Sequence, residues 1–360
     1  MDHITSIRNS TRREFVGYSC VTQPDWIRMA TSLAMTTVPG FLRKRGLSNA
    51  AGPNWKVAQL TGGVSGIVFS ADDGQRAFVV KQSLDRLAVE DEWTAPRERI
   101  LNEARVLDLI AGVVPAHSPQ LIDVDDATLT LTMEQAPSGW SDWKSELLSG
   151  EVDTTLASDL GKVLGTIHSA TAKGDWSLPP DDGIAGFNAL RIEPFHRTVA
   201  ARLPEHAGQI LSIAARVLSR ATCLVHGDFS PKNILIAPRA TGSRRFWLID
   251  DEVGHRGDPV FDLAFFLSHL ALKRIRAIAA IRPCFDEAGA SFLRGYRSTG
   301  MDVDSDDLSE QIGCLVLARV LGRSQVGYLD ETERRHALTV GAGLLSAAGA
   351  YSLDRPLTIA

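Results

Sequence analysis

The chain has 360 residues, of which 44% are hydrophobic and 22% charged, and its formal net charge is −5. This length predicts two domains or lobes with a large core, and the slightly acidic balance gives no reason to expect nucleic-acid binding. The four cysteines lack metal-like spacing and fit a reducing cytoplasm. No apolar run approaches the roughly 18 residues of a membrane span, and the N-terminus has no signal-peptide pattern. We therefore expect a cytoplasmic protein that binds neither nucleic acid nor membranes, and the oligomeric state stays open.

Residues 1–45 are predicted to be an N-terminal extension. Up to about residue 30, polar and apolar residues mix without a clear period, so we expect a loosely ordered segment. A helix is expected from Ile27 to Leu42, with a break at Pro39-Gly40.

Residues 46–136 are predicted to form a small lobe built on an antiparallel sheet. Short β-rich runs separated by Gly and Asp turns predict five strands. They are expected at Lys56–Leu60, Ile67–Ser70, Arg76–Lys81, Gln120–Val124 and Thr128–Met133. One helix is expected between the third and fourth strands because apolar residues recur at helical spacing, namely Ile100, Ala104, Leu107 and Ala111.

The turn between the first two predicted strands is rich in glycine. A residue without Cβ lets the backbone approach a phosphate chain closely, so this turn is a candidate nucleotide contact made by Gly62, Gly63, Val64 and Ser65. Most Gly-rich turns only close a hairpin, and this one lacks the Gly-Lys-[Ser/Thr] ending of a Walker A loop.

Lys81 closes an otherwise apolar strand and needs a partner, because burying an unpaired ammonium is costly. Glu103 lies beside the apolar face of the predicted helix, whereas Glu98 lies further from it. We choose Glu103 as the ion-pair partner that would hold Lys81 against the α- and β-phosphates; the alternative is a solvated surface glutamate.

The link from Glu134 to Ala136 offers backbone groups that could read an adenine edge, or it is a plain linker.

Residues 137–360 are predicted to form a larger helical lobe. An amphipathic helix is expected around Leu156–Ile167, and His168 on the same face is interpreted as a hydrogen-bonded core histidine. Asp181–Pro204 is interpreted as a long connection with a helix, and Asp302–Asp307 as a solvated loop and helix cap. Further helices are expected at Ile210–Ser219, Ile275–Ala280, Ala288–Tyr296, Leu308–Leu321 and Thr332–Leu345.

The most informative stretch is His226-Gly-Asp228-x-x-x-x-Asn233, followed by Asp250 and Glu252 at the end of another apolar run. A few Asp and Asn side chains suffice to hold Mg²⁺ with a polyphosphate, and the spacing matches the catalytic loop of protein kinases. The pattern predicts Asp228 as the base for an attacking hydroxyl, and Asn233 and Asp250 as metal ligands. The alternative is a polar loop between two hairpin strands.

With Gly257-Asp-Pro-x-x-Asp262-Leu-Ala, these motifs resemble the aminoglycoside phosphotransferase and choline kinase family of small-molecule kinases, over about residues 57–270. The resemblance implies an α+β, bilobal, protein-kinase-like fold with a small antiparallel-sheet N-lobe and a larger, mainly helical C-lobe. It implies Asp228 as the catalytic base and Asn233 and Asp250 as Mg²⁺ ligands. It also implies Lys81 as the phosphate-binding lysine. It also implies that Asp262 braces the loop around Asp228.

Val80-Lys81-Gln82, Glu92-Trp93-Thr94 and Asp250-x-Glu252 are also similar to methylthioribose kinases. Those enzymes typically lack the Asn present here as Asn233, so their substrate is not carried over. Asp251 is a second departure, since the superfamily usually has an aromatic residue there. Its charge could alter metal affinity, or it could point to solvent.

The sequence thus predicts a phosphotransferase that uses ATP and Mg²⁺ and transfers the γ-phosphate to a hydroxyl of a small molecule. An aminoglycoside-modifying kinase would need an acidic pocket, for which Asp302–Glu310 is a candidate source. A catalytically weak nucleotide-binding module is a further alternative, although the acidic residues and Lys81 are all present. A protein kinase is disfavoured because Asp262 follows Asp250 by only 12 positions and no Ala-Pro-Glu occurs. A metal hydrolase would have no use for the Gly-rich turn.

Overall fold

The computed structural model describes residues 33–49, 54–60, 66–84, 96–173, 176, 183–239, 243–347 and 351–357. All of them belong to one compact unit, Ser32–Ala360. The predictions for the first 32 residues, for Gly62, Gly63, Val64 and Ser65, and for Glu92-Trp93-Thr94 lie outside the described residues.

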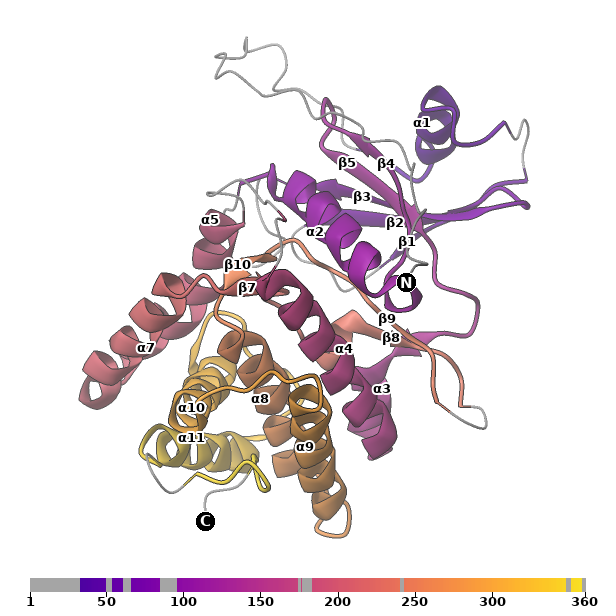
Figure 1. Cartoon of the computed structure of the whole chain (residues 1–360). Helices are drawn as coiled ribbons and strands as arrows, with labels where there is room; N and C mark the ends of the chain where they lie inside the picture. Colours follow the sequence, from indigo (N-terminus) through magenta and orange to yellow (C-terminus); the bar gives the residue numbers. More distant parts are fainter. Residues whose placement is uncertain are drawn as a thin grey trace, which may run out of the picture. The chain divides into compact units, whose positions relative to one another are not determined.

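A five-stranded antiparallel sheet forms the first part of the described chain (Figure 1), as the sequence predicts. Its strands are β1 (Lys56–Leu60), β2 (Gly66–Asp72), β3 (Ala77–Ser83), β4 (Leu121–Asp125) and β5 (Thr130–Glu134). The spatial order is β1-β2-β3-β5-β4, so β3 is central. Lys81 lies opposite Val68 on β2 and Leu131 on β5, and the middle of the sheet therefore holds this lysine.

The helix predicted at residues 27–42 is confirmed only over residues 38–42 of its described part, because residues 33–37 are not helical. Helix α1 spans Val38–Lys44, so it begins at the predicted break, with Pro39 in its first turn. Proline fits a first turn because the N–H it lacks would have no partner in the helix. Val38 and Leu42 pack with Phe69 and Val80 of the sheet, and residues assigned to the extension thus contribute to the sheet's core.

Helix α2 (Arg99–Val113) contacts two hydrophobic cores. Ile100 and Leu107 pack with Leu131 in the smaller one, against the sheet. Val106 and Ile110 belong to the large core of the helical part. Figure 1 shows α2 alongside the sheet. One helix therefore joins the sheet to the remainder of the unit.

The remainder is mainly helical, as predicted (Figure 1). Its longer helices are α3 (Trp143–Ser149), α4 (Thr154–Ala172), α7 (Ala207–Ser219), α8 (Val260–Arg276), α9 (Arg282–Arg297), α10 (Ser305–Leu321) and α11 (Glu331–Leu345). Shorter helical segments are η2 (Pro115–His117), α5 (Ile184–Phe187), the π-helix η3 (Asn188–Arg197), α6 (Thr198–Arg202), η4 (Pro204–His206) and η5 (Pro231–Asn233). The separate helix predicted at Ile275–Ala280 is wrong: α8 runs on to Arg276, and Ala277 leaves the helix with extended backbone angles.

His168 is a core histidine, which confirms the prediction. It is fully buried on α4, its Nδ1 lies 3.1 Å from the Tyr296 hydroxyl, and its Nε2 lies 3.3 Å from Asp262 Oδ2. Both ring nitrogens thus have partners, as buried polar groups require.

Candidate active site

Five short strands position the loops that hold the acidic residues of the candidate site. β7 (Cys223–Val225) pairs with β10 (His255–Gly257), and β6 (Ser141–Asp142), β8 (Ile234–Ile236) and β9 (Phe246–Leu248) form a second small sheet. Residues 226–233, here called the Asp228 loop, follow β7, and residues 249–254, the Asp250 loop, follow β9. The pairing of β8 with β9 brings the two loops together, and Ile249 N–H donates to the Asn233 carbonyl at 3.1 Å.

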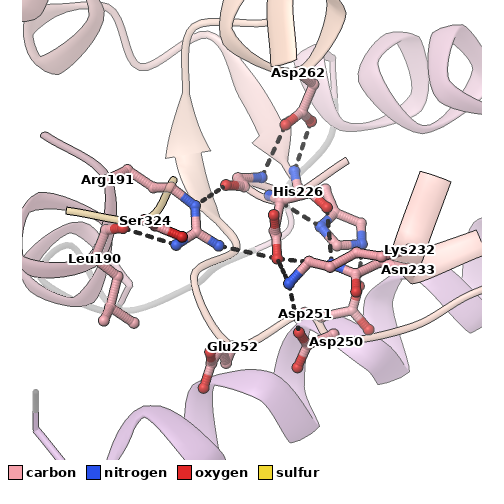
Figure 2. Close-up of polar contacts among 12 residues, drawn as sticks. Leu190, Arg191, His226, Lys232, Asn233, Asp250, Asp251, Glu252, Asp262 and Ser324 are labelled. Atoms are coloured by element: carbon pink, nitrogen blue, oxygen red, sulfur yellow. Dashed lines mark hydrogen bonds and ion pairs between the residues drawn. The ribbon is translucent and has the colours of Figure 1, made fainter. Parts of the chain in front are cut away.

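Asp262 fixes the backbone of the Asp228 loop from the first turn of α8. Its two carboxylate oxygens accept the N–H groups of His226 at 2.7 Å and Gly227 at 2.8 Å (Figure 2). Gly227 has φ +74°, and a Cβ there would lie 2.8 Å from the Val253 carbonyl oxygen, so only glycine fits. This geometry agrees with the bracing role inferred for Asp262.

Asp228 is buried among three donors. Its Oδ2 lies 3.1 Å from Arg191 Nη2, 3.0 Å from Lys232 Nζ, and 2.7 Å from Asn233 Nδ2. Burial alone would raise the pKa of Asp228, but the charges of Arg191 and Lys232 outweigh it and lower that pKa. The carboxylate is therefore ionised at neutral pH and held in one orientation.

Arg191 is a site residue that the sequence analysis missed. It lies in η3, within the stretch interpreted as a long connection, and its Nε also donates to the Gly227 carbonyl at 2.8 Å. A π-helix lacks the 3.6-residue period that pattern analysis detects, and such segments are frequent at functional sites. No signal in the sequence links this arginine to Asp228.

Lys81 binds two carboxylates from distant parts of the chain. Its Nζ lies 2.8 Å from Glu103 Oε2 on α2 and 2.6 Å from Asp250 Oδ1. Burial would lower the pKa of Lys81, but the charges of Asp250, Glu103 and Glu252 raise it well above its ordinary value. The predicted contact between Lys81 and Glu103 is thus present and the lysine carries its charge, whereas burial and the charges of Asp250 and Glu252 raise the pKa of Glu103 to about 8.

Three carboxylates converge around this ammonium. Oxygen atoms of Glu103, Asp250 and Glu252 lie within 4.8 Å of one another, a set that could hold a metal ion. Glu252 also lies 3.2 Å from Arg99 of α2. Hard oxygen donors of this kind suit Mg²⁺.

The backbone of Asp250 is left-handed, with φ +70°. Such a conformation costs an L-residue roughly 1–2 kcal/mol and is common at functional sites. Burial would raise the pKa of Asp250, but the Lys81 and Lys232 charges lower it well below its ordinary range.

Asp251 does not point to solvent, so that one of the two open alternatives is excluded. It is 2% exposed, and its Oδ1 lies 3.3 Å from His226 Nε2. Burial and the adjacent Asp250 charge raise the pKa of Asp251, although His226 opposes this. Its contacts are with the Asp228 loop.

The predicted adenine contact lies where the sheet ends. The Glu134 N–H donates to the Gln120 carbonyl at 2.9 Å and the Gln135 N–H to the Ala77 carbonyl at 3.3 Å. These two donors are therefore occupied by the sheet, and a contact to a base would depend on the Glu134 carbonyl and on Ala136.

The acidic segment proposed as an aminoglycoside pocket is largely neutralised. Asp304 caps α10, as predicted for this segment. Asp307 pairs with Arg216 and Arg220, and Glu310 pairs with Arg216 at 2.6 Å. These carboxylates hold α7 and the residue that follows it against α10. No described helix has the length and apolar character needed to cross a membrane.

A model of the phosphotransferase enzyme family matches residues 56–299 of this chain. The match covers the sheet, α2 and both acidic loops. The chain therefore belongs to the phosphotransferase enzyme family. It is a small-molecule kinase, and the class predicted from the sequence is confirmed.

Relatives and solved structures agree with this assignment. A methylthioribose kinase of Bacillus cereus strain G9842 is 23% identical over 336 residues, covering 77% of this chain and 84% of the relative. The amicoumacin kinase hAmiN has a TM-score of 0.55 at 14% identity, covering 88% of this chain and 96% of that one. A choline/ethanolamine kinase family protein from Mesorhizobium loti has a TM-score of 0.50 at 16% identity, covering 90% and 98%. The protein-kinase-like fold is thereby confirmed.

Proposed function

We propose that this kinase transfers the γ-phosphate of ATP to a hydroxyl group of a small molecule, with Asp228 as the base. The observation that carries the proposal is one continuous polar network. Lys81 contacts Asp250 at 2.6 Å, Lys232 Nζ lies 4.0 Å from Asp250 and 3.0 Å from Asp228, and Asn233 donates to Asp228 at 2.7 Å. Residues far apart in the sequence thus meet with the charges that phosphoryl transfer requires.

In the proposed reaction, Asp228 orients the acceptor hydroxyl and takes its proton. A bond forms between the hydroxyl oxygen and the γ-phosphorus, the bond from that phosphorus to the bridging β–γ oxygen breaks, and ADP leaves. The lowered pKa of Asp228 keeps it ionised and ready to accept. Lys232, with a side chain 43% exposed, can move with the phosphoryl group.

The donor set also fits a hard divalent cation. Asn233 uses its Nδ2 to hold Asp228, which leaves its Oδ1 as a ligand beside the Asp250 carboxylate. A bound Mg²⁺ would neutralise phosphate charge there. Lys81, positioned by Glu103, would hold the α- and β-phosphates. Gly62–Ser65 would cover the phosphates, and Glu134–Ala136 would contact the adenine.

The test is turnover by Asp228→Asn. ATP consumption is first screened against sugars, amino alcohols, methylthioribose and aminoglycosides, and the best acceptor is used for kinetics. Loss of a general base typically costs about 10²- to 10⁴-fold in kcat, while MgATP binding should persist. Asp108→Asn, on the exposed face of α2, is the matched control. Near-normal kcat in Asp228→Asn would remove this residue from its assigned role.

A further inference from the structure

Three basic side chains and one tyrosine form a group that has no role in the proposed function. It consists of His269 and Lys273 on α8, Arg319 on α10, and Tyr328 in the segment after α10. We call these four residues the basic cluster. Lys273 is 2% exposed and His269 6% exposed, so neither is a surface charge.

Two phenylalanine rings link the basic cluster to Arg191, which contacts Asp228. Arg191, which contacts Asp228, and Arg319 lie over the Phe195 ring with their guanidinium carbons at 5.8 and 5.7 Å from its centroid. Arg191 also lies 5.8 Å from the centroid of Phe265, whose ring meets that of His269 at 5.1 Å. Residues 265, 269 and 273 are four apart and share one face of α8.

Three polar atoms of the basic cluster lack hydrogen-bond partners among the described residues. Among the described residues, His269 Nε2, Arg319 Nε and the Tyr328 hydroxyl are buried without a hydrogen bond. Lys273 Nζ donates to the His269 carbonyl at 3.3 Å, and Arg319 Nη1 donates to the Ser324 hydroxyl at 2.9 Å. Buried polar groups are nearly always satisfied, and buried cations are nearly always paired with anions.

The described chain does not supply the missing negative charge. The Tyr328 ring lies 5.4 Å from Lys273 Nζ, and such a cation–π contact offsets only part of the desolvation cost. The Asp142 charge opposes the lowering of the pKa of Lys273, and the Asp228 charge opposes that of Arg319, but Asp142 caps α3 by accepting from Ser145 N–H and Asp228 is held by Arg191 and Lys232. Burial and the like charges of Lys144 and Arg319 lower the pKa of Lys273 to about 7.

We propose that the basic cluster binds an anionic group of the acceptor, a carboxylate or a phosphate, so that the substrate is a hydroxy acid or a phosphorylated polyol. Arginine and lysine bind such groups with charge-assisted hydrogen bonds, and the Tyr328 hydroxyl could donate a further one. The inference rests on the proposed function because it places the hydroxyl at Asp228. It disfavours polycationic acceptors, which Arg191, Lys273 and Arg319 would repel.

The first test compares acceptors that differ mainly in the charge of one substituent. Glucose, glucuronate, glucose 6-phosphate and glucosamine form one series, and glycerol, glycerate, glycerol phosphate and ethanolamine form another. An anionic member should have a kcat/KM higher than its neutral counterpart by about 10- to 100-fold. Comparing the carboxylate-bearing acceptors with the phosphate-bearing ones shows which of the two anions the basic cluster prefers. A neutral or amine-bearing acceptor that outperforms both anions overturns the proposal.

Variants of the basic cluster test whether its residues cause the preference for an anionic acceptor. Lys273→Met and Arg319→Met should each abolish most of the preference for the anionic acceptor by raising its KM, whereas Lys273→Arg should retain it. Lys162→Met, on the exposed part of α4, is the matched control. An unchanged preference in both methionine variants contradicts the assignment.

Anion binding can also be measured without turnover. For each protein, the rise in Tm in sodium sulfate is measured relative to sodium chloride at equal ionic strength. This rise should be larger for the wild-type protein than for Lys273→Met, by about 2 °C or more. The general effect of sulfate on protein stability is common to both proteins, so the difference isolates the site. Equal shifts overturn the anion site. A sulfate difference without turnover of any acceptor supports the site and counts against the proposed function.

Discussion

At the residue scale, the guanidinium of Arg191 makes two contacts with the Asp228 loop. Nε donates to the Gly227 carbonyl at 2.8 Å, and Nη2 lies 3.1 Å from Asp228 Oδ2. The first contact positions the loop backbone, and the second sets the orientation of the carboxylate. Arg191 is therefore a positioning residue for the proposed base.

Replacing Arg191 should slow turnover without affecting nucleotide binding. We expect Arg191→Met to lower kcat by about 10- to 100-fold, because a misplaced group can cost that much, with KM for ATP nearly unchanged. Arg191→Lys should recover only part of kcat, since an ammonium cannot make both contacts in a fixed fork. Steady-state kinetics in both substrates measure the two parameters. A raised KM for ATP with normal kcat would contradict the positioning role.

The contrast between Arg191 and Asp228 explains what a sequence can reveal about such a site. Asp228, Asn233 and Asp250 lie at fixed spacing in two short loops, so their pattern is visible in the sequence. Arg191 reaches Asp228 across 37 positions through a π-helix, and Asp251 is buried by the same tertiary packing. Contacts of this kind have no local signature.

At the element scale, α2 presents one polar face to the acidic loops. Arg99 pairs with Glu252, Asn102 Nδ2 donates to the Gly254 carbonyl at 2.8 Å, and Glu103 pairs with Lys81. The helix thereby ties the central strand of the sheet to the Asp250 loop. A shift of α2 would change all three contacts together.

The Glu103→Gln variant tests the register of α2. Glu103 is 1% exposed, whereas Glu98 is an exposed residue at the helix start. Neutralising Glu103 releases Lys81, and we expect KM for ATP to rise on the order of 10-fold, or about 1.4 kcal/mol. Glu98→Gln is the matched control and should behave as wild type. Greater damage from the Glu98 variant would contradict the role proposed for Glu103.

Elements with strong periodicity were predictable, and those set by tertiary context were not. The five strands follow from their β-rich runs and turn residues, and α7 and α10 from their apolar spacing. The start of α1 was missed because Pro39 reads as a break, although it lies in a first turn. The end of α8 was missed because residues 277–280 continue an apolar pattern without continuing the helix.

At the scale of the whole molecule, buried neutral histidines should make the fold sensitive to acid. Burial lowers the pKa of both His196 and His255 to about 4, whereas an unfolded histidine titrates near 6.5. Unfolding therefore takes up protons below pH 6.5. The stabilisation from each is complete above that pH and is lost as the pH falls towards 4.

Chemical denaturation at pH 7 and pH 5 measures this sensitivity. We expect the free energy of unfolding to fall by roughly 2 kcal/mol for each of the two histidines. His255→Asn should show a smaller pH dependence, and His336→Asn, at an exposed position of α11, should match wild type. A pH dependence that His255→Asn leaves unchanged would show that this histidine does not contribute.

The central claim is that Asp228 and Asp250 divide the chemistry, one acting on the acceptor and the other on the metal-bound nucleotide. Calorimetric titration of Asp250→Ala and Asp228→Asn with ATP, with and without Mg²⁺, tests it most directly. Because even outer-shell partners of a metal typically contribute 10–100-fold, Asp250→Ala should weaken MgATP binding by more than about 10-fold and lose its dependence on Mg²⁺. Asp228→Asn should bind MgATP as wild type does. Unchanged, Mg²⁺-dependent affinity in Asp250→Ala would contradict the account.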